Sequence, residues 1–186
     1  MKQQVLYYKI VENKPFNALL VLDEIGKIYY ASIGKNSNAF REQLVNDFKP
    51  LKDYQLRPVS TLNHNSAIEE EILKFMKVLK DPSTSQEFEI EFIFGTNLQR
   101  KVWNKLLEIP KGQVKTYGDI ANELGMKVGS SRAIGNCIGA NRIAIIIPCH
   151  RVLGFNKKIN GYRFGVDAKE YLLKHELGNS YDEFVK

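Results

Sequence analysis

The first third of the chain carries its apolar residues in short runs rich in β-branched and aromatic side chains. The runs VLYYKIV, NALLVL and KIYYASI occupy residues 5–11, 17–22 and 27–33, and breakers that contain Asn, Pro or Gly separate them. Such runs between turn-forming residues are typical of β-strands. A further strand is predicted for EFEIEFIF at 87–94, where apolar residues recur with period two.

Between these strand signals the pattern changes once to a helical period. In IEEEILKFMKVL, residues 68–79, the apolar positions recur near helical spacing, which predicts an amphipathic helix. The polar, proline-containing stretch DPSTSQ at 81–86 is the best candidate linker. We therefore predict an N-terminal domain over 1–86 and a C-terminal domain over 87–186.

The second half is predicted to be mostly helical, with recognisable helix starts. Thr96 and Gln99 match a capping box, as do Thr116 and Asp119. The first of these helices is expected to end at Pro110 and to bury Val102, Trp103, Leu106 and Leu107. The second is expected to run to a C-terminal cap at Gly125.

A third helix is predicted to start at Ser130 after a short glycine-bearing turn. Two short helices joined in this way form a helix-turn-helix pattern, although such pairs also occur in unrelated folds. The apolar run IAIII at 143–147 is predicted to be a buried strand that Pro148 ends. A last helix is expected to start with Asp167 as its cap and to end at Gly178. The fold class is therefore α+β.

Composition narrows the setting of the protein. The 186 residues are 44% hydrophobic and 26% charged, an ordinary globular profile. The first residues lack an apolar stretch long enough for a signal peptide or membrane span, so a reducing, cytoplasmic setting (nuclear in a eukaryote) is expected. Two cysteines imply no disulfide framework.

Charge is distributed unevenly between the two halves. The formal net charge of +6 falls entirely within residues 91–186, which carry 15 basic and 9 acidic side chains. Such a basic half indicates a polyanionic partner, and the helix-turn-helix pattern within it favours DNA.

The two cysteines have different sequence surroundings. Cys137 shares an apolar helix face with Ile134 and Ile138, so it is interpreted as core. Cys149 stands beside His150 and Arg151, and a nearby cation would favour its thiolate. A Cys–His hydrolase or acyltransferase is one reading of this pair.

Other titratable residues add little on their own. The two cysteines and His64, His150 and His175 match no ordinary zinc ligand spacing, so neither a metal nor a cofactor is expected. Glu176 stands in the last turn of its helix, where it opposes the helix dipole, which is a weak sign of function.

Four motifs together resemble one known family. IPCHRV, preceded by RAIGNCIGAN and followed by GYRFG and LLKHE, resembles the O6-alkylguanine-DNA alkyltransferases, also called methylated-DNA–protein-cysteine methyltransferases. GTNLQRKVWNKLLEIPKGQVKTYGDIA matches the start of the same domain. The resemblance covers residues 95–177. Residues before it resemble the family only in layout, as a small ribonuclease-H-like domain that would act as a scaffold.

The resemblance implies a role for each matching residue. Cys149 would accept the alkyl group, and His150 would be its base, linked through a bound water to Glu176. Asn141 would brace the turn before the active-site segment. Tyr117 would meet the flipped guanine and rotate its phosphate.

Further matches imply how DNA is held. Arg132 would enter the duplex from the minor groove and fill the space of the extruded base, beside Ser130, Ser131 and Ala133 at the helix start. The carbonyls of Cys149 and Val152 would accept from the guanine amino group, and Tyr162 would close the pocket.

Three positions depart from the pattern of some relatives. Arg163 stands where these have a serine, Phe164 replaces a tryptophan, and Arg142 replaces the proline after Asn141. These changes leave the width of the pocket and the preference among alkyl groups open.

The implied function is direct repair of double-stranded DNA that contains O6-alkylguanine, with O4-alkylthymine as a further candidate substrate. The base is flipped out and its alkyl group passes irreversibly to Cys149, once per chain. We expect a monomer in solution with no membrane partner, and leave cooperative binding along DNA open. Two alternatives remain: a lesion-binding module without transfer, and a sequence-specific helix-turn-helix regulator.

Overall fold

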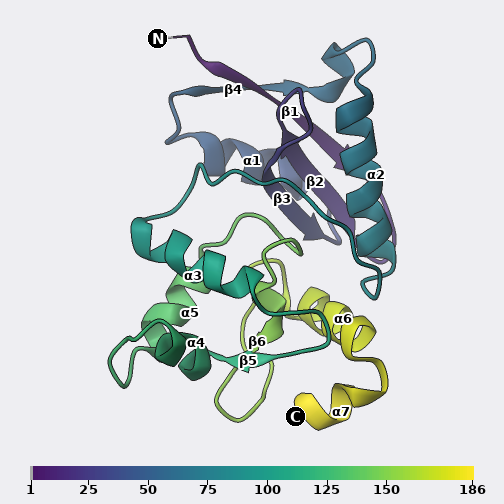
Figure 1. Cartoon of the computed structure of the whole chain (residues 1–186). Helices are drawn as coiled ribbons and strands as arrows, with labels where there is room; N and C mark the ends of the chain where they lie inside the picture. Colours follow the sequence, from purple (N-terminus) through teal and green to yellow (C-terminus); the bar gives the residue numbers. More distant parts are fainter. Residues whose placement is uncertain (1) are drawn as a thin grey trace. The chain divides into compact units, whose positions relative to one another are not determined.

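A computed structural model describes residues 2–186, which form two compact units. The first comprises residues up to Lys80 together with Thr84–Glu91, and the second comprises Asp81–Ser83 with Phe92–Lys186. No helix among residues 2–186 is long and apolar enough to cross a membrane. The fold is mixed α+β (Figure 1).

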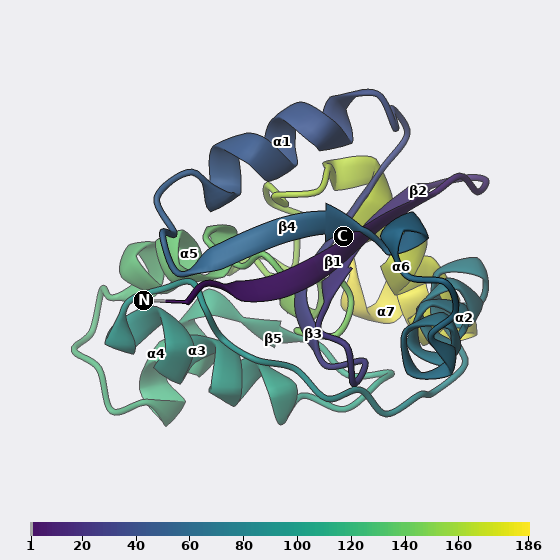
Figure 2. The same ribbon diagram turned by 90° about the horizontal axis from the view of Figure 1, so that it is seen from above.

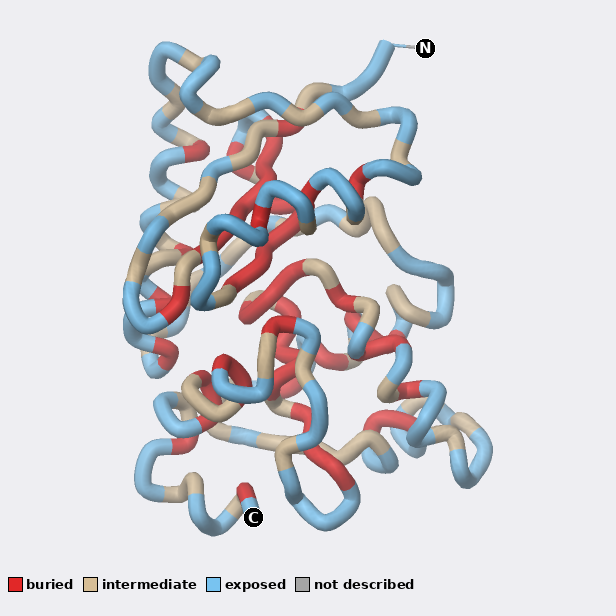
Figure 3. Tube along the Cα trace, turned by 180° about the vertical axis from the view of Figure 1, so that it is seen from behind, coloured by how far each residue is buried: buried red, intermediate tan, exposed pale blue. Residues whose placement is uncertain are grey.

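The first unit is built on a four-stranded sheet in the order β3-β2-β1-β4. β1 and β3 each pair antiparallel with β2, whereas β4 pairs parallel with β1. The strands are β1 (Gln4–Val11), β2 (Asn17–Leu22), β3 (Ile28–Gly34) and β4 (Tyr54–Pro58). The first three confirm the predicted runs. β2 and β3 are buried almost throughout, and Figure 3 shows their traces in red.

Two helices of this unit lie on either side of the sheet (Figure 2). α1 (Ala39–Phe48) connects β3 to β4, and its Asp47 accepts a hydrogen bond of 2.9 Å from the Tyr30 hydroxyl of β3. α2 (Ser66–Lys80) confirms the predicted helix over 68–79. Neither α1 nor β4 was predicted. α1 buries Phe40, Leu44 and Phe48 at helical spacing, a signal that the sequence analysis did not use, whereas β4 is short and contains only one aliphatic residue besides its terminal Tyr and Pro.

The predicted strand at 87–94 is wrong. This segment makes a single parallel bridge, between Ile28 and Ile90. The Ile28 amide donates to the Glu89 carbonyl at 2.8 Å, and the Glu91 amide donates to the Ile28 carbonyl at 2.9 Å. The alternation of apolar residues at 87–94 therefore reflects a segment that packs one side against the protein, and not a strand with a continuous series of hydrogen bonds to its neighbour. Residues Thr84–Glu91 accordingly belong to the first unit.

The second unit is mainly helical. Its helices are α3 (Asn97–Leu107), α4 (Tyr117–Glu123), α5 (Ser131–Gly139), α6 (Val166–Leu177) and α7 (Tyr181–Phe184). Short 3-10 turns are η1 (Val59–Thr61) in the first unit, and η2 (Cys149–Arg151) and η3 (Gly178–Ser180) in the second. β5 (Lys115–Thr116) and β6 (Val152–Leu153) form a two-residue parallel pair.

Local sequence signals place the starts of α3 and α4 correctly. Both capping boxes are complete, with Thr96 and Gln99 at α3 and with Thr116 and Asp119 at α4. The buried Trp103 of α3 donates its indole N–H to the Cys137 carbonyl at 2.7 Å, which ties α3 to α5. Leu107, predicted to be buried, is 42% exposed in the last turn of α3.

Two other predictions about the second unit are wrong. Residues 143–147 do not form a strand: Ile143 makes an isolated bridge and residues 144–146 form a turn, with Ile145 in the left-handed region at φ 69°. α6 begins at Val166, after Gly165 at φ 104°, so Asp167 lies inside the helix, where its carboxylate accepts from the next amide, that of Ala168. Gly178 ends α6 as predicted, at φ 54°.

Candidate active site

The backbone before Cys149 is folded into a turn that Asn141 braces. The Asn141 side chain, which is 1% exposed, accepts from the Ile143 amide at 2.9 Å and donates to the Ile143 carbonyl at 3.2 Å. Both bonds are made to the backbone of Ile143, so the Asn141 side chain takes the place of the hydrogen bonds that a neighbouring strand would have made to this residue. The same amide nitrogen donates to the Cys149 sulfur at 3.1 Å. Asn141 therefore contacts the thiol itself, beyond the bracing role that the resemblance implied.

The Cys149 thiol is held inside the protein in its protonated form. The residue is only 2% exposed, and its thiol donates to the Ile138 carbonyl at 3.7 Å. Burial raises the pKa of Cys149 to about 12, although the Asn141 amide and the positive charge of Lys169 oppose this shift. A base is therefore needed to make the thiolate near neutral pH.

His150 and Glu176 form a buried pair beside this thiol. His150 is 0% exposed, and its Nε2 lies 2.8 Å from Glu176 Oε1. The predicted water between these two side chains is wrong, because they are in direct contact. The other ring nitrogen, Nδ1, is buried and has no hydrogen-bond partner among the described residues. Burial lowers the pKa of His150, which keeps the imidazole neutral and able to accept a proton.

Arg151 explains why a carboxylate is tolerated inside this site. Its guanidinium donates to both Glu176 oxygens, at 2.8 and 2.9 Å, and to the Ile109 carbonyl at 2.7 Å. Burial alone would raise the pKa of Glu176, but the His150 and Arg151 contacts lower it to about 2. Glu176 is therefore ionised at neutral pH, which orients the imidazole and would stabilise its protonated form.

Lys169 is a site residue that the sequence analysis missed. This lysine of α6 is 1% exposed, and its ammonium donates to the Val152 carbonyl at 2.6 Å. Burial lowers its pKa to about 8, while Cys149 opposes that shift. The available signal was its position at helical spacing from Leu172 and Leu173, on the apolar side of the helix.

A cavity of about 350 Å³ opens onto Cys149. Such a volume is within the usual range for a small-molecule site and would accommodate a purine. Its walls come from α4, α5 and the segment before α6: Tyr117, Gly135, Ile138, Gly139, Gly161, Tyr162, Arg163 and Phe164. The structure thus brings Tyr117, Tyr162 and Arg163 to the same cavity as the thiol.

Tyr162 is fixed between two other rings in this wall. Its ring packs edge-on against Phe164 at 5.2 Å and against His150 at 6.5 Å between centroids. Burial raises the pKa of Tyr162 well above its usual value. The Ile145 backbone lowers that pKa slightly, but its geometry falls short of a full hydrogen bond. The Tyr162 hydroxyl is therefore protonated and makes no hydrogen bond to the described residues, so it could donate one to a ligand.

Tyr117 reaches the cavity because β5 delivers the start of α4 beside β6. Lys115 pairs with Val152 and Thr116 pairs with Leu153, and α4 begins at the next residue. Burial raises the pKa of Tyr117, and the nearby Cys149 adds to the shift, so its hydroxyl keeps its proton.

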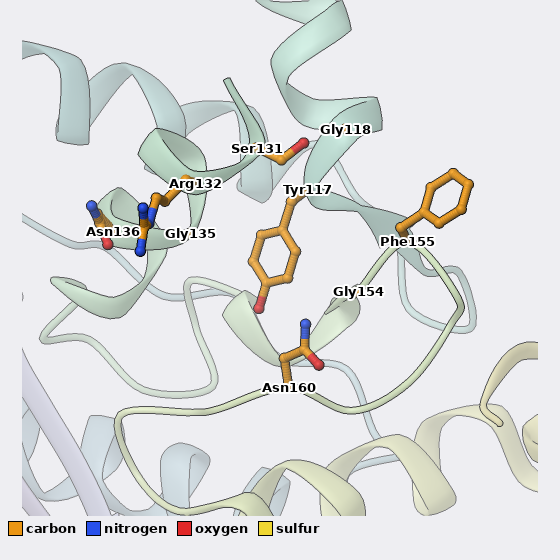
Figure 4. Close-up of a pocket in the computed structure, with 9 residues that line it drawn as sticks. All are labelled: Tyr117, Gly118, Ser131, Arg132, Gly135, Asn136, Gly154, Phe155 and Asn160. Atoms are coloured by element: carbon orange, nitrogen blue, oxygen red, sulfur yellow. The ribbon is translucent and has the colours of Figure 1, made fainter. Parts of the chain in front are cut away.

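A second cavity, of about 430 Å³, lies next to the first and shares Tyr117 and Gly135 with it. We call the cavity at Cys149 the inner cavity and this second one the outer cavity. Figure 4 shows the outer cavity with Arg132 to one side of Tyr117 and Phe155 to the other. Ser131 and Arg132 line it, whereas Ser130 and Ala133 are near neighbours outside its wall. Ser130 occupies the N-cap position of α5, although its side chain makes no capping hydrogen bond.

Comparison with known proteins gives a consistent result. A family model described as "6-O-methylguanine DNA methyltransferase, DNA binding domain" matches residues 97–178. The chain is 44% identical to a methylated-DNA–protein-cysteine methyltransferase of Lodderomyces elongisporus, over 100% of this chain and 99% of that protein. It is 47% identical to the protein of the same name from Candida albicans, over 92% and 96% of the two chains.

Solved structures show the same likeness in the fold. The crystal structure of Mycobacterium tuberculosis OGT in complex with DNA is similar to this chain with a TM-score of 0.69 and 26% identity. The match covers 92% of each chain.

Proposed function

The chain belongs to the methylated-DNA–protein-cysteine methyltransferase family, and we propose that Cys149 is the residue that accepts the alkyl group. The protein binds DNA and repairs it by transferring an alkyl group to a cysteine. Of its two cysteines, Cys137 packs with Ile134 and Ile138 in the core of α5. Cys149 lies in the wall of a purine-sized cavity and beside a histidine. That contrast is the observation that carries the proposal.

His150 is proposed as the base that removes the thiol proton. Its Nε2 is engaged by Glu176, so the buried Nδ1 is the nitrogen free to accept. A water molecule between Nδ1 and the sulfur would relay the proton. Glu176, held ionised by Arg151, then stabilises the imidazolium. Asn141 stabilises the thiolate by donating a hydrogen bond to it.

The thiolate attacks the alkyl carbon, and the carbon–oxygen bond to guanine O6 breaks. The electron pair of that bond goes to the guanine, which becomes negatively charged. The Tyr117 hydroxyl stabilises this charge while the guanine takes up a proton. The product is a thioether at Cys149. Since no group in the described site is suited to break a thioether, each chain acts once.

The base is proposed to be read by groups that line the cavity at Cys149 and by the Val152 carbonyl, which is buried and lies outside the set of lining residues. The carbonyls of Cys149 and Val152 accept from the guanine amino group. The Val152 carbonyl already accepts from Lys169, which leaves one lone pair for the base. Tyr162 and Arg163 close the cavity over the guanine. O4-alkylthymine is a further candidate for the same space.

DNA is proposed to bind through α4 and α5, which act as a helix-turn-helix. Arg132 enters through the minor groove and fills the place of the extruded base, a step that offsets part of the few kcal/mol needed for flipping. Ser130, Ser131 and Ala133 contact the backbone at the start of α5. Binding through phosphates is nearly independent of sequence and weakens steeply with salt. A sequence-specific regulator would share the dependence on salt but would prefer one DNA sequence.

The first unit is proposed to be a ribonuclease-H-like scaffold for the second. Its three antiparallel strands, followed by α1 and a parallel β4, support this assignment. We propose that the protein acts as a monomer, in the cytoplasm or, in a eukaryote, the nucleus. It needs neither a metal nor a cofactor, since the thiolate itself performs the displacement.

The test is mass spectrometry after incubation with a duplex that contains O6-methylguanine. We expect one added methyl group per chain, located by peptide mapping at Cys149, and no further addition with excess DNA. A lesion-binding module would bind the same duplex and keep its original mass. Methylation that maps to Cys137 would overturn the assignment.

A further inference from the structure

One large aromatic side chain beside the outer cavity has no role in the reaction described above. Phe155, in the loop between β6 and α6, is 96% exposed. Exposure alone decides nothing, because Leu73 on the outside of α2 is also 70% exposed. What separates Phe155 is its position in the wall of a cavity that Tyr117 and Arg132 share.

The backbone under Phe155 is held in a defined turn. The Gly154 amide donates to the Lys158 carbonyl at 3.0 Å, and the Lys157 amide donates back to the Gly154 carbonyl at 2.9 Å. The Asn156 side chain accepts from the Lys158 amide at 3.2 Å. These bonds fix the turn with its aromatic residue outward, so little backbone freedom remains to be lost when a partner binds.

The turn is also packed against the next part of the loop. A Cβ atom at Gly154 would lie 2.6 Å from the Asn160 side-chain nitrogen, so any other residue here would require the Asn160 side chain to move. Asn160 lines the same outer cavity. In Figure 4 the Phe155 ring is directed away from the Tyr117 ring, and the side chain is exposed.

The charge around Phe155 suits a phosphate backbone. Lys157 and Lys158 in the same turn are exposed, and Arg132 lies in the wall of the outer cavity. The outer cavity adjoins the inner one through Tyr117 and Gly135. A nucleotide that enters the inner cavity therefore leaves its strand neighbours at the outer one, within this basic surface.

We propose that Phe155 stacks on the base next to the extruded nucleotide in the lesion-bearing strand and so stabilises the flipped complex. The proposal rests on the function proposed above. Arg132 would fill the vacated position in the duplex, while Phe155 holds the strand where it leaves the duplex. Stacking on an aromatic ring accepts any base, which is what repair at arbitrary sequence requires.

The test compares a DNA substrate with a free base. With methylated duplex, Phe155→Ala is expected to lower the second-order rate of Cys149 methylation about fivefold or more, the low end for loss of one base–aromatic stack. With free O6-methylguanine base at millimolar concentration, the rate should equal that of the unmodified protein, because no neighbouring nucleotide is present. Phe155→Trp should restore the rate with DNA.

Two controls separate stacking from general effects. Leu73→Ala removes another exposed apolar side chain, from α2, and should leave both rates unchanged. The dependence of binding on salt should be the same for Phe155→Ala as for the unmodified protein, because no charge is lost. A 2-aminopurine placed beside the lesion should be less quenched in complexes of Phe155→Ala.

The outcomes distinguish the two proposals. Equal rates with DNA for the unmodified protein and Phe155→Ala would overturn the stacking role alone. An equal loss with DNA and with free base would also overturn it, since the effect would then lie in the inner cavity. Absence of transfer from either substrate in the unmodified protein would instead overturn the proposed function.

Discussion

The surroundings of the two cysteines differ more than their burial does. Cys137 and Cys149 are 5% and 2% exposed, and burial raises the pKa of both. Around Cys137 the structure supplies a regular helix and apolar neighbours. Around Cys149 it supplies an irregular turn, an amide donor, a buried His–Glu–Arg cluster and a cavity. Burial therefore says little about reactivity, and the polar groups that reach the sulfur decide it.

The largest expected effect comes from replacing each cysteine in turn by alanine. Cys149→Ala should abolish methyl transfer, whereas Cys137→Ala should keep one methyl group per chain and lose only about 1 kcal/mol of stability, a typical core value. Intact-protein mass and denaturant unfolding measure the two effects. Residual transfer in Cys149→Ala would show that the comparison between the two sites is mistaken.

Glu176→Gln tests the charged cluster that only the Cys149 site possesses. The amide keeps the shape but cannot stabilise an imidazolium, so the single-turnover rate at neutral pH should fall roughly 100-fold. Rapid-quench measurement with methylated duplex gives this rate. Binding of the duplex by Glu176→Gln should stay unchanged, and an unchanged transfer rate would remove Glu176 from the proton path.

Acid should weaken the protein through the same carboxylate. The pKa of Glu176 is lowered to about 2 from 4.5, so its stabilising effect is complete above pH 4.5 and is lost as the pH falls toward 2. That shift corresponds to roughly 3 kcal/mol. Urea unfolding between pH 6 and 2 measures it. The slope should be smaller in Glu176→Gln, and identical slopes would argue against a buried ionised carboxylate.

Asn141→Ala should have a smaller effect on chemistry. It removes the donor at 3.1 Å from the sulfur, and a hydrogen bond to an ionised group corresponds to about tenfold in rate or more. Alkylation of Cys149 by iodoacetamide, followed across alkaline pH, should show a higher apparent pKa. Cys137 labelling in unfolded protein provides the reference. Loss of stability without a change in the pH profile would limit Asn141 to bracing the turn.

Local signals predicted much of the fold but little of the site geometry. The capping boxes at Thr96 and Thr116 need only residues three apart, so the sequence places α3 and α4 well. The run at 143–147 was misassigned because an apolar run does not distinguish a strand from a buried turn. The brace that decides between them is the Asn141 side chain, a tertiary feature without a periodic signal.

The candidate site was predicted from sequence motifs that resemble a known family, and not from the physical properties of the individual residues. Cys149, His150, Glu176 and Tyr117 are recognisable by resemblance, and the structure brings them together. Direct His150–Glu176 contact and the Lys169 bond to Val152 depend on how α6 packs, which no local pattern encodes. Phe155 escaped notice because a loop aromatic carries no period.

The two-residue pairing of β5 with β6 has a consequence for how the second unit opens. By joining Lys115–Thr116 to Val152–Leu153, it closes the intervening chain, with α4, α5 and the acceptor turn, into a loop. Neither end of this loop can fray without releasing the other, so amide hydrogens across it should exchange with deuterium as one cooperative block. The helices proposed to bind DNA and the sulfur proposed to accept the alkyl group would then be released in a single local unfolding event.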